Sequence, residues 1–150
     1  MLDTTIISRV RAAKSRFAGA KDGNIAVLFA IAAVPIMSFV GTAIDYTRAN
    51  SARSSMQAAL DSTVLMLSKD LTDGIITTAQ LTQKAEDYFR ALYTNSDAKQ
   101  VTVNATYKVA SGASPATILI NGAGSVDTDF MKVVGFPKID FNTSSTSTWG

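Results

Sequence analysis

The sequence contains neither cysteine nor histidine. Without cysteine the chain has no thiol nucleophile and cannot be stabilised by a disulfide. Without histidine it lacks the most frequent general base of enzymes and the most frequent ligand of metal ions. These absences exclude a Ser-His-Asp triad, a catalytic thiol and an ordinary zinc site. We therefore predict a protein that is not an enzyme and has no catalytic, cofactor-binding or metal-binding residues.

Charged residues are scarce, at 17% of the chain against 47% hydrophobic residues, and their signs are unevenly distributed. Residues 1–22 hold five basic residues and two acidic ones, whereas residues 45–150 hold nine basic and ten acidic residues. The positive charge therefore belongs to a short N-terminal tail. This pattern indicates no nucleic-acid partner, and no motif indicates a small-molecule substrate. The basic residues of the tail are Arg9, Arg11, Lys14, Arg16 and Lys21.

An uncharged run of 22 residues, 23–44, follows the tail. A helix of this length is about 33 Å long, which matches the hydrocarbon core of a bilayer, about 30 Å thick. Because basic residues precede the run, the positive-inside rule predicts a cytoplasmic tail (1–22), a single transmembrane helix (23–44) and an extracytoplasmic domain (45–150). The expected anchor residues in the lipid bilayer are Ile25, Val27, Leu28, Phe29, Ile31, Val34, Pro35, Ile36, Phe39, Val40 and Ile44.

Two alternatives compete with a transmembrane helix. The first is a cleaved secretory signal, because Gly41-Thr42-Ala43 has the small-x-small pattern of a cleavage site. The apolar run is longer than the 7–15 residues usual for such a signal, which favours a retained anchor. The second is the buried core helix of a soluble protein, and a fully apolar run of this length in a small chain disfavours it.

The helical pattern continues beyond Asp45, and no proline or glycine interrupts it from Tyr46 to Thr72. Apolar and small residues recur at spacings of three and four, which predicts one face of a long helix that extends the membrane segment. This face either packs on the core of the same chain or contacts a partner. The expected packing residues are Ala49, Ala52, Met56, Ala59, Leu60 and Thr63. Asp73-Gly74 is expected to end the helix.

The remaining residues predict a second helix and then strands. Thr77 and Gln80 have the spacing of a capping box, so we expect a helix over about 78–93. Alternation of apolar and polar residues predicts strands near 101–109, 117–126 and 139–149. We expect Asp127 to cap a short helix through about Val134. The predicted fold class is α+β: a single N-terminal transmembrane helix that continues into a long helix, a second helix, and a small antiparallel sheet with a short helix.

Motifs at both ends of the uncharged run are similar to those of the Flp pilus-assembly TadE/G-like family. Lys21-Asp22-Gly23-Asn24-Ile25-Ala26-Val27-Leu28-Phe29-Ala30 opens the run. Gly41-Thr42-Ala43-Ile44-Asp45-Tyr46-Thr47-Arg48 closes it, and Met56-Gln57-Ala58-Ala59-Leu60-Asp61-Ser62 follows. The resemblance is specific over about 17–65 and is closest to the TadG-like branch. It implies a bacterial inner-membrane protein with a periplasmic domain, and other pilus-assembly proteins as partners.

Two departures from the family pattern refine this expectation. Prepilin-type members carry Glu at the fifth position after the processed glycine, where this chain has Leu28, so we expect a retained anchor. Longer TadG-like proteins carry a D-x-S-x-S metal site, whereas Asp140-Phe141-Asn142-Thr143-Ser144 is expected to be a plain strand. Residues 45–150 are nevertheless a candidate for the first part of a longer protein that continues beyond Gly150. We predict a non-catalytic, pilin-like scaffold of pilus assembly, with a membrane-tethered ligand-binding or adhesion module as the alternative.

Overall fold

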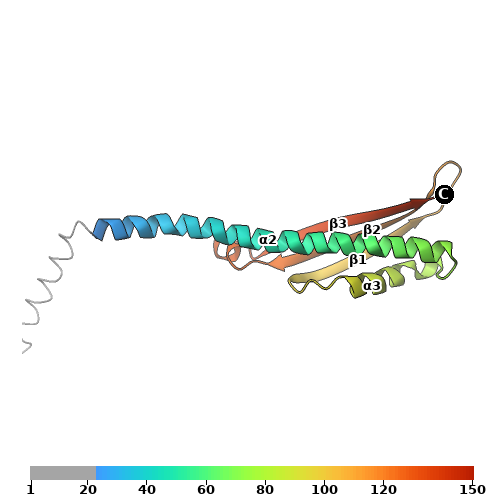
Figure 1. The fold of residues 1–150 in the computed structure, drawn as a ribbon, viewed down its shortest axis with the longest axis horizontal. Helices are drawn as coiled ribbons and strands as arrows, with labels where there is room; N and C mark the ends of the chain where they lie inside the picture. The colour runs from blue at the N-terminus through green and yellow to red at the C-terminus, as the bar shows by residue number, and fades with distance from the viewer. Residues whose placement is uncertain (1–22) are drawn as a thin grey trace, which may run out of the picture. The chain divides into compact units, whose positions relative to one another are not determined.

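The computed structural model describes residues 23–150, and it has the predicted α+β fold. The basic tail, with Arg9, Arg11, Lys14, Arg16 and Lys21, lies outside the described residues. Residues 41–150 form one compact unit, and the described residues before them, 23–40, belong to another. In chain order (Figure 1) the elements are α2 (Gly23–Thr72), η1 (Thr78–Gln80), α3 (Leu81–Leu92), β1 (Ala98–Lys108), β2 (Ala116–Asp127), η2 (Met131–Val134) and β3 (Lys138–Trp149).

Helix α2 is 50 residues long and contains the uncharged run as well as the amphipathic segment that follows it. Pro35 lies inside the helix, where its ring removes one backbone hydrogen bond. The helix ends at Thr72, and Asp73-Gly74 follows it as predicted. The φ of Gly74, +71°, is the left-handed conformation that glycine adopts without strain. The N–H of Ile75 then donates to the carbonyl of Asp70 at 2.8 Å, which satisfies a carbonyl of the last turn.

The three strands form an antiparallel sheet in the order β1-β2-β3. In the central strand, Ile120 lies opposite Ala105 of β1 and Ser145 of β3. Ile118, Ile120 and Val126 alternate along β2 and are buried, whereas Asn121 and Ala123 between them are exposed. One face of the sheet is therefore the core face, and the other face is open and polar.

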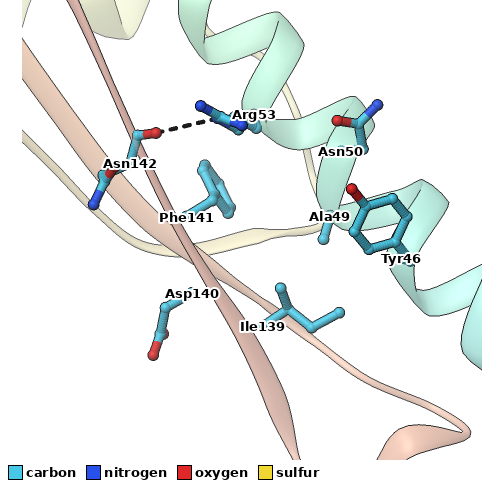
Figure 2. A pocket seen from close by; sticks show the side chains of 8 residues that line it. All are labelled: Tyr46, Ala49, Asn50, Arg53, Ile139, Asp140, Phe141 and Asn142. Atoms are coloured by element: carbon cyan, nitrogen blue, oxygen red, sulfur yellow. Dashed lines mark hydrogen bonds between the residues drawn. The ribbon is translucent and has the colours of Figure 1, made fainter.

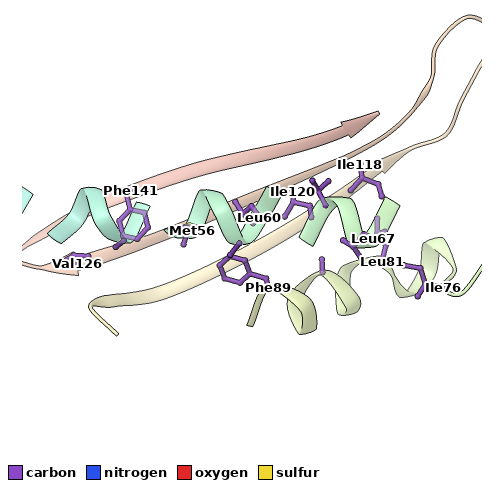
Figure 3. Close-up of a cluster of buried hydrophobic side chains, with 14 of the residues drawn as sticks. Met56, Leu60, Leu67, Ile76, Leu81, Phe89, Ile118, Ile120, Val126 and Phe141 are labelled. Carbon is purple, nitrogen blue, oxygen red and sulfur yellow. The ribbon is translucent and has the colours of Figure 1, made fainter. Parts of the chain in front are cut away.

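The core lies between this face of the sheet and helices α2 and α3 (Figure 3). Gly122 on β2 allows the close approach of α2, because a Cβ at this position would lie 2.9 Å from the sulfur of Met56 and 3.0 Å from Cδ1 of Leu60. The buried apolar residues of the domain are Ala49, Ala52, Met56, Ala59, Leu60, Val64, Leu67, Ile76, Leu81, Ala85, Phe89, Ile118, Ile120, Val126 and Phe141.

Candidate functional site

The first part of α2, before Gly41, has the properties of a membrane anchor. It belongs to the one helix in residues 23–150 that is long and apolar enough to cross a membrane. Its large side chains are exposed, including Phe29 at 74% and Phe39 at 78%. Side chains of a buried core helix would be covered, so this alternative does not fit the described structure. The exposed anchor residues are Ile25, Val27, Leu28, Phe29, Ile31, Val34, Ile36, Phe39 and Val40, together with Ile44 in the domain unit; Pro35 is also exposed.

Gly41 is the first of three α2 residues that hold the loop between β2 and β3. The ring of Phe130, from this loop, lies directly over Gly41. A Cβ built on Gly41 would lie 2.6 Å from Cβ of Phe130 and closer still to its ring. Any larger residue at position 41 would therefore displace Phe130 or the helix, so glycine is required here by contact rather than by backbone conformation.

Asp45, one helical turn later, is fully buried and acts as a remote cap for the same loop. One carboxylate oxygen accepts the N–H of Asp129 at 2.9 Å. The other oxygen accepts the N–H groups of Phe130 at 2.9 Å and of Met131 at 2.8 Å. Burial by itself raises the pKa of Asp45, but the three N–H donors and nearby Arg48 outweigh it, and the net pKa lies below the ordinary value. The side chain is therefore held as a carboxylate.

Arg48 completes this face of α2 by binding two carboxylates from different parts of the chain. Its guanidinium donates to Asp129 at 2.7 Å and to Asp97, just before β1, at 3.1 Å. These bonds lower the pKa of Asp97 and raise the pKa of Arg48. Gly41, Asp45 and Arg48 are spaced by four and three residues, so they lie on one helical face. Together they hold the β2–β3 loop, and Arg48 also holds the segment just before β1.

The predicted cap at Asp127 is wrong. Asp127 is the last residue of β2 and pairs with Lys138 of β3, so it continues the sheet. The N–H groups at the start of the following 3-10 turn, η2, are bound by Asp45 instead. In the sequence, Asp45 and Arg48 are recognisable only as parts of the family motif. The available signal was a carboxylate placed directly after a long uncharged run.

The six predicted packing residues lie together on the inner face of α2. Ala49, Ala52, Met56, Ala59, Leu60 and Thr63 are all buried within the chain. Both the sheet and α3 contribute residues to the same core. The side chains that α2 leaves exposed lie on its opposite face and include Ser54, Ala58, Asp61 and Leu65.

An open groove of about 360 Å³ runs between α2 and β3 (Figure 2). Arg53 crosses it and donates from Nε to the backbone carbonyl of Asn142 at 3.2 Å. Tyr46 and Asn50 line it from the helix. The other lining residues are Ala49, Ile139, Asp140 and Phe141. This lining offers hydrogen bonds and an apolar floor. Within residues 23–150 no three His, Cys, Asp or Glu side chains gather where they could hold a metal ion.

A second groove of about 490 Å³ lies between α3 and the edge strand β1. Phe89 and Tyr93 form its apolar wall, and their rings stack with centroids 5.1 Å apart. The remaining lining residues are Glu86, Arg90, Asn95, Val101, Thr102 and Val103. Both grooves therefore offer hydrogen-bonding groups beside apolar side chains.

Comparison with known families finds a similarity over most of α2. Residues 23–66 match the model of the family described as "Putative Flp pilus-assembly TadE/G-like". This match confirms the resemblance predicted from the motifs of the segment. The match includes Gly41, Asp45 and Arg48. No curated protein and no solved structure matches the chain.

Proposed function

We propose that this protein is a membrane-anchored, non-catalytic scaffold of Flp-type pilus assembly. The observation that supports the proposal is that one helix carries both an exposed apolar segment and part of the domain core. Its first part exposes apolar side chains up to Val40, and its second part buries Met56, Leu60 and Leu67 in the domain. The family match over 23–66 covers both parts. A domain built on its own anchor is suited to stay at the membrane and contact other subunits.

The orientation follows from charge. The basic residues of 1–22 favour a cytoplasmic tail, which places residues 45–150 in the periplasm of a bacterial inner membrane. Asp45 and Arg48 support an exit near residue 44, because they are the first charged residues after the uncharged run and both are bound to residues of the domain. The anchor is retained in this proposal, since Gly41 within the signal-like triplet is itself packed against Phe130.

Partner subunits have two surfaces available on the domain. The outer face of α2, with Ser54, Ala58, Asp61 and Leu65, is exposed along three turns. The open face of the sheet offers polar side chains such as Asn121. The inner-face residues Ala49 to Thr63 contribute indirectly, because they hold α2 against the sheet and so fix the geometry of the exposed face.

Counting pili on cells tests the assembly role. We expect a strain that lacks the gene to show few or no surface pili, and the intact gene to restore them. A photo-cross-linking residue at Ala58, on the outer face of α2, or at Asn121, on the open sheet face, should capture a defined pilus-assembly protein. The same residue at Val109, which is exposed in the β1–β2 turn outside both surfaces, is the control. Normal pilus numbers without the protein would overturn the proposal.

The groove between α2 and β3 supports a second candidate, a membrane-tethered binding or adhesion module. Its polar lining, with Asn50, Arg53 and Tyr46, could recognise an extracytoplasmic ligand. This function predicts that cells without the protein keep their pili but lose attachment to a surface. It also predicts that Asn50→Ala and Tyr46→Ala reduce attachment while pilus numbers stay unchanged.

A further inference from the structure

We infer that the loop between β2 and β3 inserts apolar side chains into the outer surface of the bilayer, as a second membrane contact beside the helix. This inference rests on the proposed membrane anchor. The loop comprises residues 128–137, and we call Phe130, Val133, Val134 and Phe136 its apolar tip. These four side chains are 48%, 83%, 65% and 59% exposed, respectively. Four large apolar side chains in seven residues are an unusual surface for a water-facing turn.

The contacts of the loop fix its position along the helix. Phe130 packs on Gly41, which lies within the uncharged run and follows Val40 directly in the chain. Gly41 precedes Ile44, the last uncharged residue, by about 4.5 Å of helix rise. A residue in contact with Gly41 is therefore level with the outer end of the predicted span. Interfacial segments bury apolar side chains about 5–10 Å deep, and the helix rise from Gly41 to Ile44 is close to this depth.

The loop is held firmly in this place. Asp45 binds three consecutive N–H groups at residues 129–131, and Arg48 binds the side chain of Asp129. The loop also closes on itself, because the N–H of Thr128 donates to the carbonyl of Pro137 at 3.0 Å. In Figure 1 the loop that contains η2 lies beside α2. The apolar tip is thus a fixed feature of the domain rather than a free segment.

A lipid surface is the occupant that this position favours. The tip lies beside Gly41 of the uncharged run, whereas the exposed residues of α2 just beyond Arg48, such as Ser51, Ser54 and Ser55, are polar. Lys132, in the middle of the tip, is half exposed. Its long side chain can reach from an apolar boundary to lipid phosphates. A protein partner would instead cover the tip and shield it from lipid. Quenching by labelled lipids distinguishes a lipid contact from a protein contact.

Single-cysteine labelling tests this contact, because the native chain has no cysteine. The full chain is placed in vesicles of phosphatidylethanolamine and phosphatidylglycerol, with an environment-sensitive nitrobenzoxadiazole dye on Val133→Cys. Doxyl-labelled lipids serve as the quencher from within the bilayer. The matched control is Val109→Cys, an apolar residue that is 71% exposed in the β1–β2 turn. It lies at the opposite end of β2, about 36 Å away along the strand.

We expect several-fold stronger quenching and a blue-shifted emission at position 133 compared with position 109. Equal quenching at the two positions would overturn the inference. Protection of position 133 from aqueous iodide without quenching by lipid would also overturn it, in favour of a protein contact. Phe39→Cys in the span separates this result from the proposed function. If position 39 is quenched and 133 is not, only the loop contact fails; if 39 is not quenched, the anchor fails with it.

Discussion

The carboxylate of Asp45 accepts the backbone N–H of Met131 at 2.8 Å across 86 positions of sequence. This bond joins the exit of the apolar segment to the last connection of the sheet. The same carboxylate binds the two preceding N–H groups. A single buried acidic side chain, the first residue after the uncharged run, therefore fixes the β2–β3 loop to the helix.

The first prediction concerns the stability of this connection. Asn in place of Asp45 cannot accept three N–H groups, because its own NH₂ group faces at least one of them. We expect Asp45→Asn to lower the free energy of unfolding by about 2 kcal/mol, the usual effect of leaving buried donors unpaired. Denaturation of the full chain in micelles can be followed by the fluorescence of Trp149, which stacks on Tyr107. Asp61→Asn, on the exposed face of α2, is the control and should change little; equal effects would count against the cap.

The second prediction is the dependence of stability on pH. The pKa of Asp45 is lowered in the folded state, and so is that of Asp97 beside Arg48. A lowered pKa means that the unfolded chain binds protons more readily, so stability is full above the unfolded value of about 3.9 and decreases as the pH falls below it. We expect the unfolding midpoint to drop in this acidic range. The drop should be smaller in Asp45→Asn, and identical pH profiles for the two proteins would refute the assignment.

The third prediction tests the contact between Gly41 and Phe130 by whether Gly41→Ala lowers or raises the stability of the domain. Alanine normally favours the interior of a helix over glycine by about 1 kcal/mol. We expect Gly41→Ala to destabilise the domain instead, because the new Cβ overlaps Phe130. In a Phe130→Gly background the atoms in conflict are absent, and the same substitution should become neutral or stabilising. A stabilising effect in the native background would show that the ring does not pack there.

The fourth prediction concerns Thr63, which is fully buried on the inner face of α2. Within the described residues its hydroxyl has no hydrogen-bond partner. Valine has nearly the same shape without the unpaired hydroxyl, so Thr63→Val should raise the free energy of unfolding by about 1 kcal/mol. Thr63→Ser keeps the hydroxyl and removes the methyl group, and it should destabilise the core. If Val is the worse substitution, an unseen partner binds the hydroxyl.

Local patterns in the sequence were sufficient for the elements of the fold. The absence of charge from 23 to 44 and the unbroken helical spacing to Thr72 predicted the long helix, because both depend on neighbours along the chain. Asp73-Gly74 marked its end, where Gly74 takes the left-handed conformation. The alternation of apolar residues predicted the three strands, since burial of one sheet face imposes that period.

Contacts distant in sequence could not be predicted in the same way. Asp127 satisfies the local rule for a helix cap, yet pairing with Lys138 extends the strand through it. The residue that actually caps these N–H groups, Asp45, lies in α2, 84 to 86 positions earlier in the sequence. No local sequence pattern identifies the groups that it binds. The close approach of α2 at Gly122 depends likewise on which strand lies under Met56. The sequence left open whether the inner face of α2 packs within the chain, and the fold places all six residues in its own core.

The central claim is that the apolar part of α2 stays attached to the domain and in the membrane. Alkaline carbonate extraction of cell membranes, followed by intact-mass measurement of the protein, tests it most directly. The account predicts that the protein remains in the membrane fraction with a mass that includes residues 1–43. Recovery of a dissolved protein whose first residue follows Ala43 would contradict it.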